Sequence, residues 1–118
     1  MATLTTHLLD SVDGTHAGGV GVTLARIEPS GARVVVFERE TDPGGRLAVA
    51  IEIAAENAKA RYELVVASGN YFEARPMPRP SRQILREVVF RFTIPDTEGS
   101  YHIPMMLAPN SYSVWWSS

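Results

Sequence analysis

The chain contains short stretches in which hydrophobic and polar residues alternate at every second position. In residues 19–26 the large apolar side chains are Val20, Val22 and Leu24, while Gly, Thr and Ala occupy most of the other positions. A period of two places the apolar set on one face of a strand. Residues 88–94 repeat the pattern, with Val, Phe, Phe and Ile on one parity and Val, Arg and Thr on the other. Both stretches therefore predict strands with one buried face.

Turn-forming residues separate these stretches at fairly regular intervals. Pro, Ser and Gly lie between residues 19–26 and the β-branched run 33–39, which predicts an antiparallel hairpin. The sequence Asp-Pro-Gly-Gly at 42–45 precedes two further expected strands at 47–53 and 62–67. Roughly seven or eight short strands of this kind predict an all-β chain folded as an antiparallel β-sandwich.

Helical patterns are few. Residues 54–60 contain good helix formers but are too short for an independent helix, and residues 68–74 have the length of one or two turns. Residues 75–82, RPMPRPSR, have the composition of a proline-rich ligand or an anion-binding arginine cluster. We interpret them as a surface loop, because proline is excluded from central strands and arginine is usually solvated. The sequence predicts one short helix beside the strands.

Composition narrows the possible functions. The 118 residues suit a single domain, 1–118, and the formal net charge of -2 gives no basic surface for nucleic acids or anionic membranes. The absence of cysteine excludes disulfides, thiolate zinc sites and cysteine nucleophiles. The first residues lack the basic and apolar regions of a signal peptide, and no stretch approaches the roughly 20 apolar residues of a spanning helix. We expect a cytoplasmic protein.

The candidate chemistry is therefore that of histidine and arginine. No serine lies in a Gly-x-Ser-x-Gly elbow, and the glycine pairs at 18–19 and 44–45 lack the context of a phosphate loop. The histidines are His7, His16 and His102, and none lies at a metal-ligand spacing from another. We expect neither a metal nor a cofactor. Arg46 follows the turn at 42–45, and spacing alone does not separate a solvated side chain from a fixed guanidinium.

Strand parity says more about His102 and its surroundings. In residues 101–108 the core-like residues are Ile103, Met105 and Leu107, so His102 shares the opposite face with Pro104 and Met106. A face of that composition suits subunit packing, with the histidine at a lined cleft. His7 shares its parity with Thr5 and Leu9.

Four motifs together resemble a known family. They are "LTTHLLD", "TDPGGR" ending at Arg46, "RYELVVASGNYF" and "YHIPMMLAPNSYS", in order from about Leu4 to Ser113. They resemble the transthyretin-like family, whose enzyme members are 5-hydroxyisourate hydrolases of purine catabolism. The resemblance implies a transthyretin-like β-sandwich and a homotetramer with active sites in a channel between dimers. It also implies a cofactor-free hydrolysis that opens the ring of 5-hydroxyisourate at an amide bond.

The same resemblance implies which residues are catalytic. The family's motif positions fall on His7, Arg46 and His102, and the sequence leaves open which histidine is the base. A neutral imidazole can deprotonate water, and a guanidinium can bind the substrate and steady an oxyanion. His16 stands where the family commonly has proline, and we expect it to be a solvent-facing loop residue without a catalytic role.

The C-terminus departs from the family pattern. Hydrolases of the family end in Tyr-Arg-Gly-Ser, whereas this chain ends in Trp115, Trp116, Ser117 and Ser118, which we expect to bind substrate and to be covered by a neighbouring subunit. Trp116 replaces a cation with an apolar plane. This leaves three hypotheses: a 5-hydroxyisourate hydrolase, a repurposed hydrolase or cyclase acting on a more apolar molecule in a biosynthetic pathway, and a non-catalytic carrier.

Overall fold

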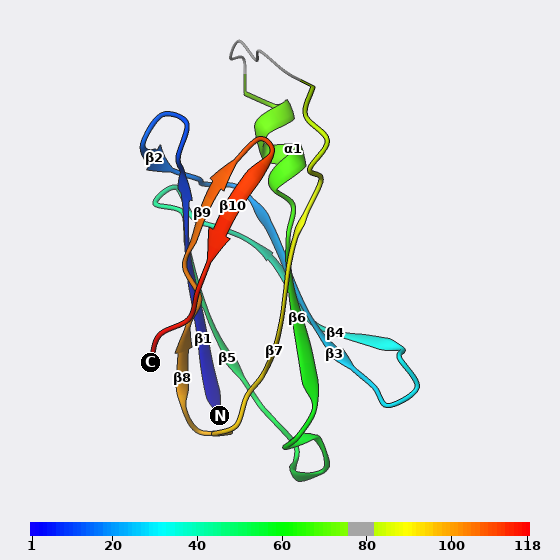
Figure 1. The fold of residues 1–118 in the computed structure, drawn as a ribbon. Helices are drawn as coiled ribbons and strands as arrows, with labels where there is room; N and C mark the ends of the chain where they lie inside the picture. The colour runs from blue at the N-terminus through cyan, green and yellow to red at the C-terminus, as the bar shows by residue number, and fades with distance from the viewer. Residues whose placement is uncertain (76–81) are drawn as a thin grey trace.

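The computed structural model describes residues 1–75 and 82–118, and its strands form two sheets that face each other (Figure 1). The predicted all-β sandwich is confirmed. The strands of the described residues are β1 (Ala2–Asp10), β2 (Thr15–His16), β3 (Gly21–Ile27), β4 (Arg33–Glu40), β5 (Arg46–Ile51), β6 (Arg61–Val66), β7 (Val88–Thr93), β8 (Ser100–His102), β9 (Met105–Ala108) and β10 (Ser111–Val114).

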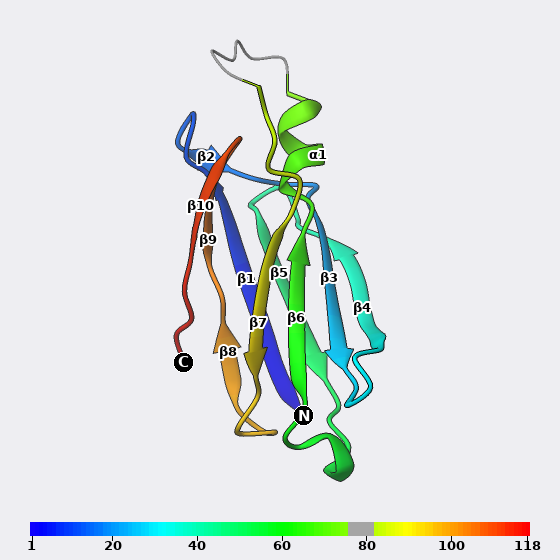
Figure 2. The ribbon, with the colours of Figure 1, turned by 45° about the vertical axis from the view of Figure 1, so that its right-hand side comes forward.

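Strand β1 organises the first sheet. It pairs with β5 in antiparallel orientation along one side, and with β8 and then β9 in parallel along the other. Strand β10 extends this side as an antiparallel partner of β9, and the short β2 folds back on the end of β1. Figure 2 shows β8, β9 and β10 at one side of the molecule and β4 at the opposite side. The strand that follows the turn at 42–45 (β5) and the strand that contains Tyr101 and His102 (β8) thus flank β1 on its two sides.

The second sheet is antiparallel throughout, in the order β4-β3-β6-β7. The predicted hairpin of β3 and β4 is confirmed, with a register irregularity between Leu24 and Ala25. Val20, Val22 and Leu24 are buried, as their parity predicts, and they belong to the hydrophobic core between the sheets. On β7, Val88 is buried and Phe90 and Phe92 are partly buried, so its predicted apolar face also points inward.

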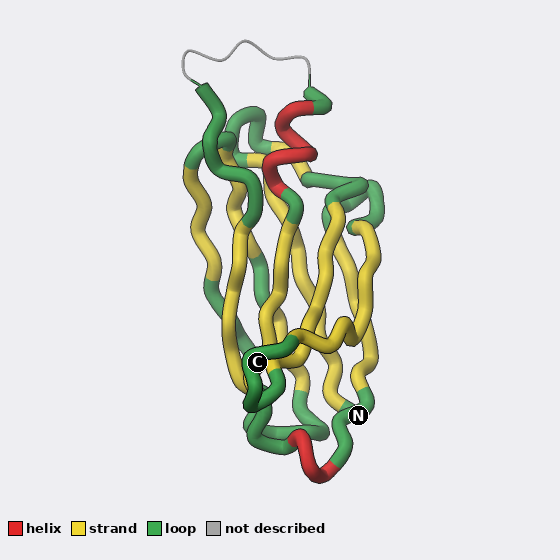
Figure 3. Tube along the Cα trace, turned by 90° about the vertical axis from the view of Figure 1, so that its right-hand side faces the viewer, coloured by secondary structure: helices red, strands yellow, loops and turns green. Residues whose placement is uncertain are grey.

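The helical predictions differ in outcome. The helix α1 (Ser68–Glu73) follows β6 as expected and covers one end of the sandwich, where the buried ring of Phe72 joins the core. Residues 54–60 contain only the 3-10 turn η1 (Ala55–Asn57), which lies at the opposite end of the molecule (Figure 3). The predicted loop at 75–82 falls mostly on residues 76–81, which lie outside the described part of the chain. Neither described helix is long and apolar enough to cross a membrane.

The parity prediction for the strand around His102 needs one correction. Ile103, Met105 and Leu107 are buried and Met106 is exposed, as predicted, but Pro104 is buried as well. The C-terminal segment runs beside this position, and the Pro104 carbonyl accepts a hydrogen bond from the Trp115 amide. The chain's own terminus therefore covers part of a face that parity had assigned to the outside.

Glu63 is a buried carboxylate on β6, and its contacts lead us to expect a fold whose stability falls in acid. The guanidinium of Arg33 donates to it at 2.7 and 2.9 Å, and that of Arg91 donates to it from the adjacent β7. These hydrogen bonds lower the pKa of Glu63 from its usual 4.5 to about 2. Because the folded pKa is depressed, this stabilisation is complete above pH 4.5 and is lost as the pH falls toward 2.

We therefore expect the melting temperature, followed by circular dichroism, to fall between pH 5 and pH 2. Glu63→Gln should lower the melting temperature at pH 7 and make its decline with acid smaller. Glu38→Gln, at an exposed position of β4, is the matched control and should retain the full decline. An equally steep decline in Glu63→Gln would show that other carboxylates dominate the acid response.

Candidate active site

The three residues implied as catalytic lie on one face of the first sheet. His7 on β1 is the cross-strand partner of Arg46 on β5. His102 on β8 is the partner of Thr5, which lies two residues before His7 and on the same face of β1. Cross-strand partners point to the same side of a sheet, so His7 on β1 lies between Arg46 on β5 and His102 on β8, on one face. The structure brings together residues from both ends of the chain.

The imidazole of His102 is held by a hydrogen bond with the side chain of Thr5. Its Nδ1 lies 2.7 Å from the Thr5 hydroxyl. Nε2 makes no hydrogen bond to any residue that the structure describes, and it is the nitrogen available to a water or a substrate. The backbone of His102 is also fixed, because its amide donates to the Ser117 carbonyl at 2.9 Å and its carbonyl accepts from the Ser117 amide at 2.8 Å. Both side chain and backbone are therefore constrained.

The turn at 42–45 places Arg46 opposite His7. Gly45 has a φ of 74°, and a Cβ built on it would lie 2.4 Å from the Leu8 carbonyl oxygen, so glycine is required at this close approach. The Asp42 carboxylate accepts from the Arg46 backbone amide at 2.9 Å. Within the described ranges, the Arg46 guanidinium forms no ion pair. Its charge therefore remains available for a ligand.

A cavity of about 510 Å³ lies beside these residues. Arg46 and His102 both line it, so the two residues share a common space. Acidic groups line it as well, and they were not predicted. The lining residues are Thr5, Thr6, Glu40, Asp42, Arg46, Leu47, Ala48 and His102. A volume of this size suits a small polar molecule.

His7 makes a contact that the sequence did not predict. Its Nε2 lies 2.9 Å from Nδ1 of His16, and the two rings stack with centroids 5.0 Å apart at an interplanar angle of 24°. The pKa of His7 is lowered, first by burial and then by the charges of Arg46, His16 and, more weakly, His102. A hydrogen bond with the Gly44 backbone acts in the opposite direction. The surroundings of His7 therefore favour its neutral form.

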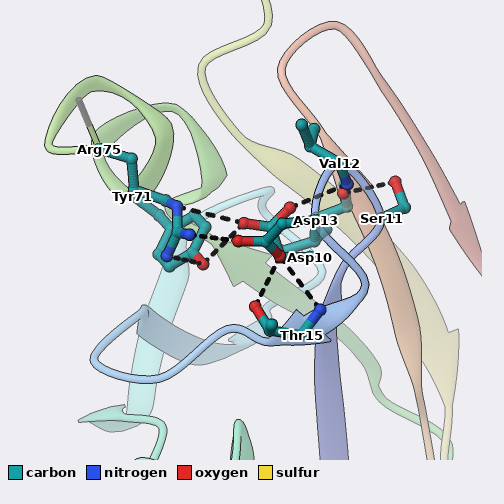
Figure 4. Close-up of polar contacts among 8 residues, drawn as sticks. Asp10, Ser11, Val12, Asp13, Thr15, Tyr71 and Arg75 are labelled. Carbon is teal, nitrogen blue, oxygen red and sulfur yellow. Dashed lines mark hydrogen bonds and ion pairs between the residues drawn. The ribbon is translucent and has the colours of Figure 1, made fainter. Parts of the chain in front are cut away.

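A network of polar side chains holds the turn that carries His16 (Figure 4). Asp10, fully buried at the end of β1, accepts hydrogen bonds from the Val12 amide at 2.9 Å and from the Tyr71 hydroxyl at 2.8 Å. Arg75 lies 3.3 Å from Asp10, forms an ion pair with Asp13 and donates to the Tyr71 hydroxyl. Burial and the bond to Asp10 raise the pKa of Tyr71 to about 12. Residues around α1 thereby fix the turn between β1 and β2.

Two of the C-terminal residues contact different residues of β8: Ser117 contacts His102, and Trp116 contacts Tyr101. Ser117 lies beside His102 through the paired backbone hydrogen bonds. Trp116 contacts the ring of Tyr101 with centroids 5.7 Å apart, and both line a separate cavity of about 340 Å³ together with Phe90, Phe92, Thr93, Pro95 and Ile103. Trp115, Ser117 and Ser118 line neither of these two cavities, and the indoles of Trp115 and Trp116 remain 46% and 57% exposed.

Comparisons with known proteins agree with this architecture. The profile of the HIUase/Transthyretin family matches residues 4–116. The chain belongs to this family. The family resemblance of the sequence motifs is thus confirmed over nearly the whole chain.

Individual members of the HIUase/Transthyretin family give the degree of similarity. 5-Hydroxyisourate hydrolase 2 of Rhizobium meliloti (strain 1021) is 36% identical over 112 residues, which cover 95% of this chain and 92% of that protein. The structure of Klebsiella pneumoniae 5-hydroxyisourate hydrolase matches with a TM-score of 0.77 and 29% identity over the whole of both chains. Sea bream transthyretin in complex with thyroxine matches with a TM-score of 0.78 at 21% identity, over 97% of this chain and 93% of that one, and it shares the fold.

Two residues of the site were missed in the sequence. Thr5 has the same strand parity as His7, and that parity was a usable signal for its place beside the site. For His16 the signal was Asp13-Gly14, a dipeptide typical of tight hairpin turns. Such a turn folds the chain back on β1 and pairs His16 with Leu9, next to His7 on the same side of the sheet. In residues 1–75 and 82–118 there is no group of three or more His, Cys, Asp or Glu side chains that could hold a metal ion.

Proposed function

We propose that this protein is a 5-hydroxyisourate hydrolase, a cofactor-free cyclic amide hydrolase of purine catabolism that acts in the cytoplasm. The observation that carries the proposal is that Arg46 and His102, whose guanidinium and Nε2 have no partner among the described residues, line one cavity, in a chain whose similarity to named hydrolases spans nearly its full length. A base and a cation on one small cavity are what the hydrolysis of a polar, anionic ring requires.

His102 is the general base in this proposal. When Thr5 accepts a hydrogen bond from Nδ1, the lone pair of the imidazole is on Nε2, which faces the reacting water. Nε2 takes a proton from the water as the water oxygen attacks the carbonyl carbon of the scissile amide. When the carbon–nitrogen bond then breaks, the same proton passes from the imidazolium to the leaving nitrogen. The ring opens with the addition of one water molecule.

Arg46 supplies the charge complementarity. Its guanidinium donates hydrogen bonds to the urea-like edge of the substrate and to the oxyanion that forms at the attacked carbonyl. The absence of an ion pair to a described side chain favours this role, because an arginine already paired with a carboxylate has less positive potential to offer. His7 lies opposite Arg46. Because the surroundings of His7 favour its neutral form, His7 does not repel the Arg46 guanidinium.

We extend the proposal to a homotetramer with its active sites at the interface between dimers. Exposed apolar side chains beside the site support it. Met106 and Trp115 are each more than two-fifths exposed, although both side chains are large and apolar. Met106 lies on the side of the sheet that carries His102. A partner subunit would remove these surfaces from water and enclose the cavity. The C-terminal residues Trp115, Trp116, Ser117 and Ser118 would then contribute to substrate binding from within the assembly.

The activity is tested with 5-hydroxyisourate made in situ by urate oxidase, whose decay is followed by ultraviolet absorbance. We expect the protein to accelerate the decay above the spontaneous rate. Arg46→Ala should lower kcat/KM by about 10²–10³-fold, the usual effect of removing one group that stabilises an oxyanion. Arg39→Ala, which removes an exposed arginine of β4, is the matched control and should keep full activity. Decay no faster than the spontaneous reaction would refute the proposed function.

A further inference from the structure

We propose that His16 is a positioning residue for His7: the two imidazoles form one hydrogen-bonded pair that carries at most one positive charge, which rests on His16 and keeps His7 neutral beside Arg46. The importance of a neutral His7 for catalysis rests on the proposed function. The existence of the pair and its charge do not depend on the proposed function.

The distance between the rings limits the pair to one shared proton. His7 Nε2 and His16 Nδ1 are 2.9 Å apart, which is the length of a hydrogen bond. Only one of two facing nitrogens can carry a hydrogen at that separation, while the other accepts it with its lone pair. If both rings were imidazolium, both nitrogens would carry hydrogen and the contact would break. The separation of 2.9 Å between the two nitrogens therefore excludes the doubly charged pair.

The surroundings decide which ring holds the charge. His16 is exposed, so water solvates a charge on it well, whereas His7 is half-buried. His7 also faces Arg46 on β5 and lies near His102 on β8, and the charges of both residues disfavour a positive charge on His7. The acidic groups nearby are Glu40 and Asp42, which line the neighbouring cavity. Burial and Arg46 are the leading causes of the lowered pKa of His7, so the acids do not reverse the balance.

The fold holds His16 in place for this contact. The pairing of His16 with Leu9 aligns β2 beside β1. Asp13 accepts hydrogen bonds from both the amide and the hydroxyl of Thr15, the residue before His16. The ion pair of Arg75 with Asp13 then links this turn to the residues after α1 (Figure 4). The His16 ring is thus positioned by a network that lies outside the cavity.

The pair has a consequence for substrate binding. With His7 neutral and the charge of the pair on the exposed His16, which does not line the cavity, an anionic substrate in the cavity meets the defined positive charge of the Arg46 guanidinium. If His7 became charged, it would repel Arg46 and would draw the anion away from the His102 side of the cavity. His16 thereby protects the geometry of binding as the pH falls toward the range in which an isolated histidine becomes protonated.

Nuclear magnetic resonance titration of the histidine rings in the full-length protein tests the pair directly. In the unmodified protein we expect the His7 ring to titrate in two steps, because the second imidazole lies within hydrogen-bond distance of it. His16→Asn keeps a hydrogen-bonding group near the position of Nδ1 but cannot be charged, and His16→Phe keeps a stacked ring without a nitrogen. In both variants we expect His7 to titrate in one step, at a higher pH than in the unmodified protein.

The enzymatic readout follows the same direction. Because the neutral form of His7 is required, activity declines as the pH falls through its pKa, and the acid limb of the kcat/KM profile should move to higher pH in both His16 variants. Val12→Ala changes an exposed side chain of the same turn and is the control for general disturbance. It should leave both the two-step titration and the acid limb unchanged.

Two results would overturn the pair. They are an identical His7 titration in the unmodified protein and in both His16 variants, or a loss of the two-step titration in Val12→Ala equal to that in the His16 variants. A coupled titration in a protein that does not accelerate the decay of 5-hydroxyisourate would support the pair and refute the proposed function instead.

Discussion

Replacement of His102 by Asn is expected to lower kcat/KM for 5-hydroxyisourate by about 10²–10⁴-fold, the usual contribution of a general base. Asparagine retains a polar atom near the position of Nδ1, so the contact with Thr5 is preserved. It places no base at the position of Nε2. The loss therefore reports the proton transfer and not the local packing. The ultraviolet assay with urate oxidase measures it across a range of pH.

The control for this prediction is Thr5→Val. Valine is close in shape to threonine and leaves the imidazole of His102 intact, but it removes the hydroxyl that fixes the ring. We expect a loss of activity smaller than that of His102→Asn, together with an unchanged melting temperature for the latter. Activity of His102→Asn close to that of the unmodified protein would assign the base to another group and contradict the role proposed for His102.

Replacement of Asp10 by Ala is expected to lower the free energy of unfolding by about 3 kcal/mol, because breaking a buried pair leaves its partners uncompensated. Asp10 is fully buried and holds the Val12 amide, the Tyr71 hydroxyl and Arg75. Its removal leaves the half-buried Tyr71 hydroxyl without an acceptor for its hydrogen and releases the helix end from β1. Urea denaturation followed by circular dichroism measures the change.

Asp10→Asn separates the two contributions of this side chain. The amide oxygen can still accept hydrogen bonds, while the charge that faces Arg75 is lost, so we expect a smaller loss of stability than for Asp10→Ala. Because the network also holds the turn of His16, both variants should weaken the effect of His16 on the titration of His7. A midpoint of unfolding in Asp10→Ala equal to that of the unmodified protein would show that the network contributes nothing to stability.

The faces of the strands could be predicted from the sequence with considerable detail. The alternation in residues 19–26 identified the buried set, and the parity around His102 separated the histidine from Ile103 and Met105. The family motifs also pointed to His7, Arg46 and His102 together, and these three lie on one sheet around β1. Parity failed at Pro104, because it does not register a segment that returns from elsewhere in the chain to cover an outward position.

The contacts around the site were less accessible to prediction. Thr5 and His102 are 97 residues apart in the chain, and only the parallel pairing of β1 with β8 makes them neighbours. The partner of His7 is nearby in sequence, but it depends on a tight turn and a two-residue strand. Trp116, expected near the substrate, lines the cavity next to Tyr101 in this chain. Its proposed part in substrate binding remains a prediction about the assembly.

The sequence by itself determined the strand faces, the turns and the candidate chemistry of histidine and arginine. These follow from local rules, because side-chain direction along a strand alternates with residue number and turn residues act on their own backbone. Only the tertiary structure decided which strands became neighbours. Backbone hydrogen bonds pair any two strands alike, so the choice of partner depends on how the whole chain buries its apolar faces. That choice placed Thr5 against His102 and His16 against His7.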